Sequence, residues 1–233
     1  MNSKRIRLWD LPTRLFHWLL AASVVAAVVS AQVGGNMMDW HGRIGLFIVG
    51  LLTFRLVWGV MGSTYARFLQ FVPTPAKVKA YLRGEWHGVG HNPLGAFSVF
   101  GLLALLGFQS ISGLFSNDDI AFTGPLFDLI SKDRSNLLTG LHHLASNLIY
   151  VLVALHIAAI AFYARVKKDN LVKPMITGWK DLEPGDSAQS ATGGGALAFV
   201  VALAVALAAV YFASGKWMPA APPPPPAAAT PAW

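Results

Sequence analysis

The stretch Leu137–Ala164, LLTGLHHLASNLIYVLVALHIAAIAFYA, contains three histidines and no charged residue. A helix of about 20 apolar residues spans the hydrocarbon core of a bilayer, so this stretch is long enough to cross a membrane. Ionisable side chains are costly at membrane depth and usually serve a function there. The stretch therefore predicts a transmembrane helix whose histidines carry the chemistry of the protein.

The rest of the chain has the same character. Of its 233 residues, 55% are apolar or aromatic and 12% are charged, whereas a soluble domain has about 25% charged residues. We therefore predict an all-α integral membrane protein with five transmembrane helices. The predicted spans are 15–34, 40–61, 93–115, 138–165 and 195–214.

The 18 Lys and Arg residues predict the orientation, because cytoplasmic loops are enriched in them. Fourteen of them fall in the N-terminal segment, in the loop 62–92 with Arg55 at its edge, or in the loop 165–194. We expect a bacterial inner-membrane protein with a cytoplasmic N-terminus and a periplasmic C-terminus. The net charge of +7 then reflects topology and contact with membrane lipid, and no nucleic-acid partner is needed to explain it.

Composition also divides the chain along its length. Residues 1–182 contain the first four predicted spans, and 195–214 form the fifth. The small polar residues of 183–194 predict a flexible linker. Five consecutive prolines predict an extended or disordered periplasmic tail over 215–233.

The chain contains no cysteine. This excludes a Cys-ligated iron–sulfur cluster, a covalently attached c-type haem, a disulfide and thiol catalysis. A redox metal would have to be bound by other side chains, and the seven histidines are the natural candidates.

Four histidines form two pairs at matching depths. His142 and His156 are 14 residues apart, so they project from nearly one helix face about 21 Å apart. Antiparallel helices place His41 at the depth of His142 and His17 at the depth of His156. Two imidazoles on either side of an iron are a common ligation of b-type haem, so the pattern predicts two stacked haems.

Other uses of these histidines remain open at this point. A lone histidine in a span is more often a packing residue, although four in two matched pairs make coincidence less plausible. A zinc site or proton pathway would more often use intramembrane Asp or Glu, and the predicted spans have none. His143 points about 100° away from His142 and should face the outer loop. His87 and His91 are interpreted as solvated residues of the cytoplasmic loop, with a quinone-site role as the alternative.

Several motifs in residues 1–182 are similar to those of one family. They are WDLPTRLFHW at 9–18, His41 with Gly45, FRLVWG at 54–59, GSTYARF at 62–68, GHNPLGA at 90–96, His142 to His156, and KDNLV with MITG between 168 and 178. With this set the chain resembles the bacterial cytochrome b561 superfamily, in the branch of the b-type cytochrome subunits of nickel–iron hydrogenases.

The resemblance implies a four-helix bundle with two haem b groups, ligated by His17, His41, His142 and His156. It also implies electron transfer between the quinone pool and a periplasmic or membrane redox subunit, such as a cytochrome c or a dehydrogenase. His143 stands where relatives often have an acidic residue, which leaves the choice between His142 and His143 open. The fifth span and the tail are not explained by the resemblance.

Two other functions compete with this interpretation. One is a stand-alone superoxide:quinone or quinol oxidoreductase, and the other is a non-redox membrane transporter or anchor. No arrangement of nucleophile, base and orienting residue is recognisable, so no catalytic residue is predicted.

Overall fold

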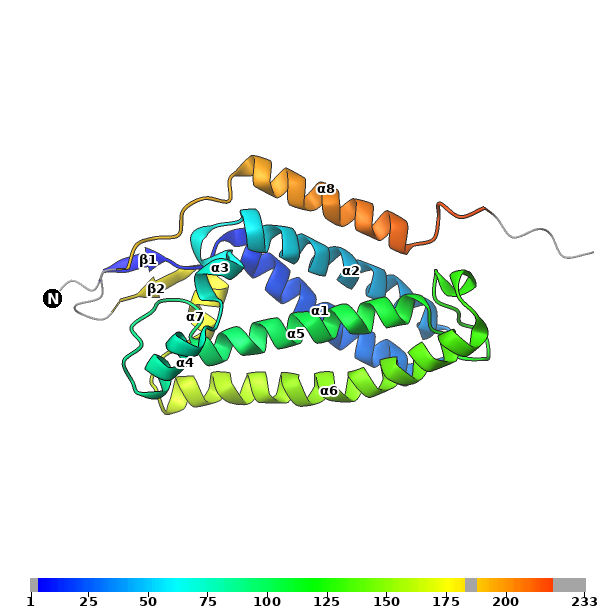
Figure 1. Ribbon diagram of the computed structural model, residues 1–233, viewed down its shortest axis with the longest axis horizontal. Helices are drawn as coiled ribbons and strands as arrows, with labels where there is room; N and C mark the ends of the chain where they lie inside the picture. The colour runs from blue at the N-terminus through cyan, green and yellow to red at the C-terminus, as the bar shows by residue number, and fades with distance from the viewer. Residues whose placement is uncertain (1–3, 183–187, 220–233) are drawn as a thin grey trace, which may run out of the picture.

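A computed structural model describes residues 4–182 and 188–219 as a mainly helical protein (Figure 1). Five helices are long and apolar enough to cross a membrane, which confirms the prediction of a helical multi-pass protein. The expected linker residues 183–187 and the tail residues 220–233 lie outside the described part of the chain. The five long helices are α1 (Leu11–Val33), α2 (Met37–Met61), α5 (Pro93–Leu114), α6 (Lys132–Arg165) and α8 (Ala196–Ala213).

Short elements at the chain ends and in the loops were not predicted. The two strands pair antiparallel, with Ile6 opposite Lys180, and so bring the start of α1 close to the segment that follows α6. These elements are β1 (Arg5–Arg7), η1 (Thr64–Ala66), α3 (Phe68–Phe71), α4 (Pro75–Leu82), η2 (Phe127–Leu129), α7 (Val172–Thr177) and β2 (Trp179–Asp181).

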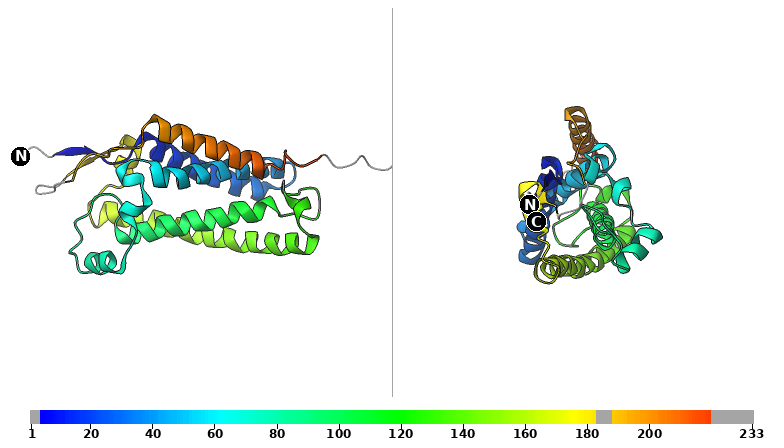
Figure 2. Two further views of the ribbon diagram at one scale, coloured as in Figure 1. Left: turned by 45° about the horizontal axis from the view of Figure 1, so that its top comes forward. Right: turned by 90° about the vertical axis from the view of Figure 1, so that its left-hand side faces the viewer.

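The long helices pack in neighbouring pairs (Figures 1 and 2). Helix α1 runs along α2, α6 runs along α5, and α2 joins the pairs through its contact with α5. One apolar cluster, which includes Ile48, Leu106 and Ile149, lies among α2, α5 and α6. A second cluster, which includes Phe54, Trp58 and Ala202, lies between α2 and α8. Helix α2 is therefore the central helix, with the bundle on one face and α8 on another.

A buried carboxylate connects the start of α1 to the end of α2. Asp10 caps α1 by accepting from the backbone N–H of Thr13 at 2.6 Å. Its other oxygen accepts from Trp58 Nε1 at 3.0 Å and from the hydroxyl of Ser63. Asp10 is 8% exposed and Trp58 is 1% exposed. Hydrogen bonds to a charged group shielded from water are among the stronger ones, so Asp10 fixes the register of α1 on α2.

Helix α8 packs against the outer face of α2. Phe199 contacts the rings of Phe54 and Trp58, with ring centres 5.7 Å and 6.2 Å apart. Gly50 allows the close approach, because a Cβ there would lie 2.8 Å from Val210. The segment before α8 is also attached, since Ala191 donates its N–H to the carbonyl of Arg7 at 2.7 Å.

Further hydrogen bonds connect the described residues of the predicted linker, 183–194, to the rest of the protein. In the described residues of that segment, Thr64 donates its N–H to the carbonyl of Thr192, and Tyr65 donates its hydroxyl to the carbonyl of Gln189. The small polar residues leave backbone groups open to such bonds, and composition does not reveal them.

The α5–α6 connection is also more ordered than a charged loop suggests. The Asn117 side chain donates to Ser135 Oγ at 2.6 Å, and Ser135 donates to the carbonyl of Phe115 at 2.6 Å. Asp118 accepts three backbone N–H groups, which lower the pKa of its carboxyl. Helix α6 consequently starts at Lys132, six residues before the predicted span.

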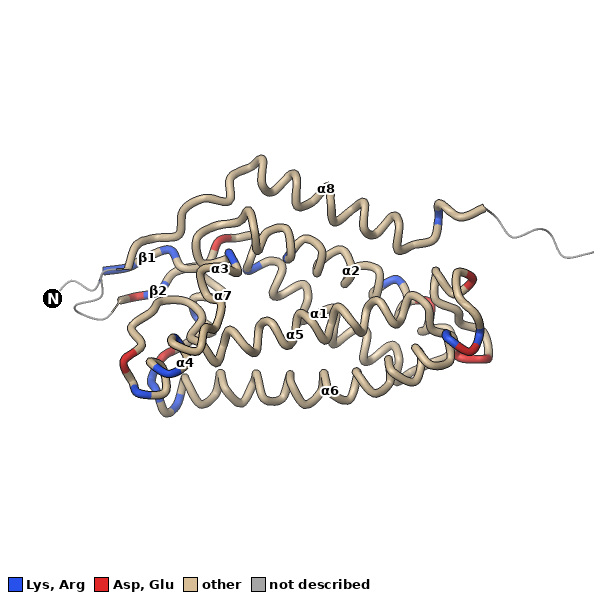
Figure 3. The backbone as a smooth tube through the Cα atoms, viewed as in Figure 1, with Lys and Arg blue, Asp and Glu red and all other residues tan. Residues whose placement is uncertain are grey.

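The charged residues lie toward the two ends of the bundle along the chain trace (Figure 3). Most Lys and Arg lie at the end that contains β1, β2, α4 and α7, which we call the basic end. The opposite end contains the α1–α2 turn and the α5–α6 loop, and we call it the distal end.

Asp10 provides a test of how the bundle is held together. We expect Asp10→Ala to lower the free energy of unfolding by about 2–4 kcal/mol, because it removes a helix cap and the acceptor of two further donors. Asp10→Asn should cost less, since its amide oxygen still accepts. Thermal unfolding of the detergent-purified proteins, followed by circular dichroism, measures the difference. Equal stability of Asp10→Ala and the unchanged protein would contradict this role.

Candidate functional site

The four predicted ligand histidines come together in two pairs. His17 of α1 and His156 of α6 form the basic-end pair, with ring centres 6.4 Å apart. His41 of α2 and His142 of α6 form the distal pair, with ring centres 6.1 Å apart. Each pair joins α6 to a helix of the α1–α2 layer, across the middle of the bundle.

These separations have a chemical meaning. A metal–nitrogen bond is about 2 Å long, and the centre of an imidazole lies about 1 Å behind its nitrogen, so two imidazoles on one metal have centres about 6 Å apart. Both pairs match that value. In the described residues, no group of three or more His, Cys, Asp or Glu could hold a metal ion. Each pair supplies two imidazoles at a separation that suits one metal ion.

The distal imidazoles are oriented by backbone carbonyls. His41 Nδ1 lies 2.9 Å from the carbonyl oxygen of Ala27, and His142 Nδ1 lies 3.0 Å from that of Gln109. A carbonyl oxygen only accepts, so Nδ1 carries the proton in both rings. This leaves Nε2 of each ring free to bind a metal, the arrangement typical of ligand histidines.

Two buried serines accompany these carbonyls and were missed by the sequence analysis. Ser30 donates to the carbonyl of Ala27 at 2.9 Å, and Ser112 donates to that of Gln109 at 3.0 Å. Both serines are 1% exposed. Ser112 Oγ also lies 3.1 Å from Nδ1 of His142. In both cases the serine follows, by three residues, the residue whose carbonyl accepts from the histidine. This spacing could identify such serines in the sequence, but only once the helix that faces each histidine is known.

The basic-end pair has different surroundings. Nδ1 of His17 is buried without a hydrogen-bond partner among the described residues. Buried nitrogens without partners also occur nearby in Arg14, Arg55 and Arg67. Arg55 is 3% exposed and its guanidinium lies over the ring of Phe68, 4.5 Å from the ring centre. The basic end therefore holds several hydrogen-bond donors that the described residues leave without acceptors.

His91 corrects one sequence interpretation. It is partly buried rather than solvated, because its ring contacts those of Trp9 and Phe71, with ring centres 4.8 Å and 4.6 Å away. Burial, with a smaller contribution from the charge of Arg55, lowers the pKa of His91 to about 3. His91 is thus neutral at physiological pH. His87, by contrast, is exposed as expected.

His143 lies outside both pairs. It is exposed, whereas His142 is partly buried against α5 and faces His41. Residues 142 and 143 thus project from different faces of α6, as helix geometry predicts.

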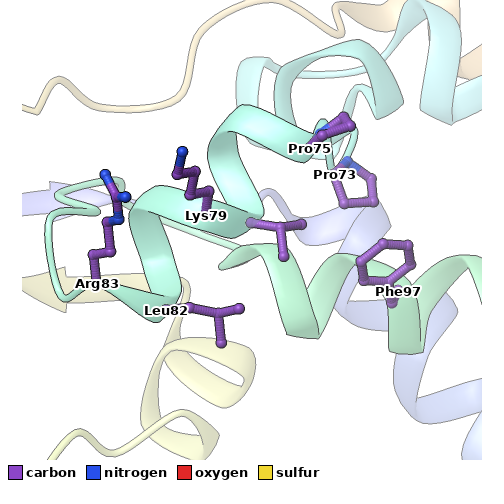
Figure 4. Close-up of a pocket in the computed structure, with 7 residues that line it drawn as sticks. Pro73, Pro75, Lys79, Leu82, Arg83 and Phe97 are labelled. Carbon is purple, nitrogen blue, oxygen red and sulfur yellow. The ribbon is translucent and has the colours of Figure 1, made fainter.

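An open groove elsewhere on the surface does not involve the histidines. It has a volume of about 540 Å³ and lies between α4 and the first turns of α5 (Figure 4). Leu82 and Phe97 line it together with Lys79 and Arg83. The histidine pairs remain the arrangement with recognisable chemistry.

Comparison with known families identifies the architecture. The family model described as prokaryotic cytochrome b561 matches residues 8–178, which include all four paired histidines. The chain belongs to the prokaryotic cytochrome b561 family. This confirms the resemblance found in the sequence motifs, and α8 lies outside the matched range.

Individual relatives of this cytochrome b561 protein are distant. A probable Ni/Fe-hydrogenase B-type cytochrome subunit from Azotobacter chroococcum is 24% identical over 218 residues, covering 75% of this chain and 88% of the relative. A protein of the same description from Cupriavidus necator is 24% identical over 216 residues, covering 76% and 87%. A probable Ni/Fe-hydrogenase 1 B-type cytochrome subunit from Escherichia coli is 22% identical over 136 residues, covering 45% and 57%. No solved structure matches the chain.

A b-type cytochrome implies haem b, and the residues of this cytochrome b561 protein fit that group. The ring-centre separations would suit one haem iron held between the two imidazoles of each pair. The chain has no cysteine that could attach a haem covalently.

Gly113 provides a test of the distal pair. A Cβ on Gly113 would lie 3.0 Å from Cε1 of His142, whereas a Cβ on Gly107 of the same helix meets nothing within 4 Å. We expect Gly113→Ala to displace the His142 ring and therefore to change the electron paramagnetic resonance signal of a haem iron bound to that ring. Gly107→Ala is the matched control and should leave the spectrum unchanged. Identical spectra of both variants would show that the ring has room to move.

Proposed function

We propose that the chain binds two haem b groups, one between each histidine pair. We propose further that it transfers electrons across the membrane between the quinone pool and a periplasmic redox partner. The main support is that two histidine pairs lie at two depths of one apolar bundle, each with its ring centres at the distance that one bound metal ion requires. The helix rise places His142 and His156 about 21 Å apart along α6, a large part of the bilayer thickness.

Each part of the chain has a role in this proposal. His17, His41, His142 and His156 bind the irons, and the haems supply one-electron redox chemistry. The carbonyls of Ala27 and Gln109 orient the distal imidazoles and make them better donors to iron. The apolar helices exclude water from the space between the pairs.

The distribution of basic residues supports the orientation. Basic loops remain on the cytoplasmic side, so the basic end with His17 and His156 faces the cytoplasm. His41 and His142 then lie near the periplasmic side, and the odd number of crossings carries the C-terminus to the periplasm. We place the protein in the bacterial inner membrane.

The names of the relatives support the choice of partner. Those proteins are described as probable cytochrome subunits of nickel–iron hydrogenases. We propose that this chain likewise serves a hydrogenase-type redox complex, rather than acting as a stand-alone superoxide:quinone or quinol oxidoreductase.

Haem content tests the first step. We expect two haem b groups per chain, both extracted by acid–acetone because no covalent bond holds them. A pyridine haemochrome assay against protein concentration measures the ratio. One haem per chain, or haem that resists extraction, would contradict the proposal.

Single histidine replacements test which residue binds which haem. His142→Ala should remove the distal haem alone, because the basic-end pair uses other residues. His143→Ala is the matched control on the next residue and should keep both haems. Haem content and the reduced-minus-oxidised spectrum distinguish the variants. If His143→Ala lost a haem and His142→Ala kept both, the ligand assignment on α6 would be wrong by one residue.

Electron transfer is tested with the purified holoprotein in lipid vesicles. A reductant that cannot cross the bilayer should reduce both haems, and a lipid-soluble quinone should then oxidise them. A stand-alone oxidoreductase would in addition be reduced rapidly by superoxide, and a non-redox protein would show no haem spectrum.

A further inference from the structure

The guanidinium of Arg55 is the most deeply buried charge in the described residues, and its position is specific. Arg55 follows His41 by 14 residues on α2, the same spacing that separates His142 from His156 on α6. Four helical turns return a side chain to within about 40° of the same face. Arg55 therefore lies on the face of α2 that carries His41, but at the other end of the bundle.

The position of Arg55 along the length of the bundle matches that of the basic-end pair. Arg55 lies six residues before the end of α2, and His17 lies six residues after the start of α1. The two helices pack side by side in opposite directions, so Arg55 and His17 are at the same level.

The chain builds a specific place for this guanidinium. Phe68 lies beneath it, and Gly59 one turn further along α2 makes room for Phe68, because a Cβ there would lie 2.0 Å from the ring. Contact with the face of an aromatic ring stabilises a buried cation. The N–H groups of Arg55 lie in the plane of the guanidinium, so this contact leaves them available to an acceptor.

An acceptor for those N–H groups is missing from the described residues. Nη1 of Arg55 is buried without a partner, and none of their carboxylates lies within ion-pairing distance of it. The nearby acid Asp10 already accepts from Thr13, Trp58 and Ser63. The charge of Asp10 acts on Arg55 from nearby but leaves Nη1 without an acceptor among the described residues. An unmet hydrogen bond of a buried charged group is costly, so an anion is expected at these N–H groups.

His91 adds a second donor to the same region. Its Nδ1 is also buried without a partner among the described residues, and its ring packs against Phe71, which contacts Phe68, the ring beneath Arg55. A neutral imidazole can donate one N–H to an anion without adding charge.

We propose that Arg55, assisted by His91, binds a propionate carboxylate of the haem held by His17 and His156. A propionate is the anion that a haem at this site necessarily brings, and a guanidinium matches a carboxylate with two parallel hydrogen bonds. The inference rests on the proposed dihaem function. Arg55 is then a positioning residue that fixes the rotation of this haem about its iron and raises its reduction potential, because positive charge favours the reduced state.

Redox titration of the holoprotein tests the proposal. Arg55→Gln, measured in the His142→Ala background so that only the basic-end haem remains, should lower the midpoint potential of that haem or cause its loss. Arg43→Gln is the matched control, because Arg43 lies on the same helix over an aromatic ring, 5.2 Å from the centre of Trp40, but is exposed. It should leave the potential unchanged.

Arg55→Lys keeps the test decisive if the Gln variant does not fold. Lysine retains the charge but replaces two parallel hydrogen bonds with a single ammonium group. The propionate-bending band in the resonance Raman spectrum should therefore shift in Arg55→Lys. An unchanged band would overturn the proposal.

Two further outcomes would also overturn it. Unchanged haem potential in Arg55→Gln would show that no haem carboxylate depends on Arg55. Unchanged potential with slower oxidation by quinone would assign the donors to a quinone headgroup instead. Absence of haem from the unsubstituted protein would refute the dihaem function itself, and is distinguishable from both.

Discussion

The structure depends on keeping two imidazoles close together at each of two depths, with ring centres 6.4 Å apart in one pair and 6.1 Å apart in the other. A shift of α6 by one helical turn, about 5.4 Å, would separate both pairs at once. The chain prevents such a shift at both ends. At the basic end, Arg14 and Trp18 of α1 donate to the carbonyls of Ile176 and Met175, in the segment that follows α6. At the distal end, the side chain of Asn117 binds the first turn of α6.

Buried polar groups in this apolar bundle differ in whether the described residues give them a hydrogen-bond partner. The two distal imidazoles have acceptors, since Ser30 and Ser112 share carbonyl oxygens with His41 and His142. Oε1 of Gln109 and several nitrogens of the basic end are buried without a partner among the described residues. An unpaired polar group in a low-dielectric interior costs about 1–3 kcal/mol. A group that binds at the basic end, where most of these atoms lie, would therefore stabilise the protein.

The features that the sequence predicted correctly are those that depend on local periodicity. Long uncharged runs indicated the five membrane helices, and the 14-residue spacing on α6 indicated which histidines share a face. Contacts between distant segments could not be predicted in this way. Three contacts of this kind join residues far apart in the chain. Ile6 pairs with Lys180, Trp58 donates its Nε1–H to Asp10, and the ring of His91 packs against Phe71. Hydropathy also placed the start of the fourth span at residue 138, after the charged residues of the preceding loop. Hydrogen bonds of that loop extend α6 back to Lys132.

Helix α2 shows how one periodic sequence supports two different neighbours. Positions 41, 48 and 55 recur every seven residues and stay within about 40° of one another, so His41, Ile48 and Arg55 share the face turned to the bundle interior. Positions 50, 54 and 58 lie about 180–260° around the helix from His41, and their residues contact α8. The additional helix thus covers a surface that the histidine pairs do not use. A polar or bulky substitution at position 50 would disturb α8 without reaching either pair, whereas the same change at position 48 would disturb the packing between them.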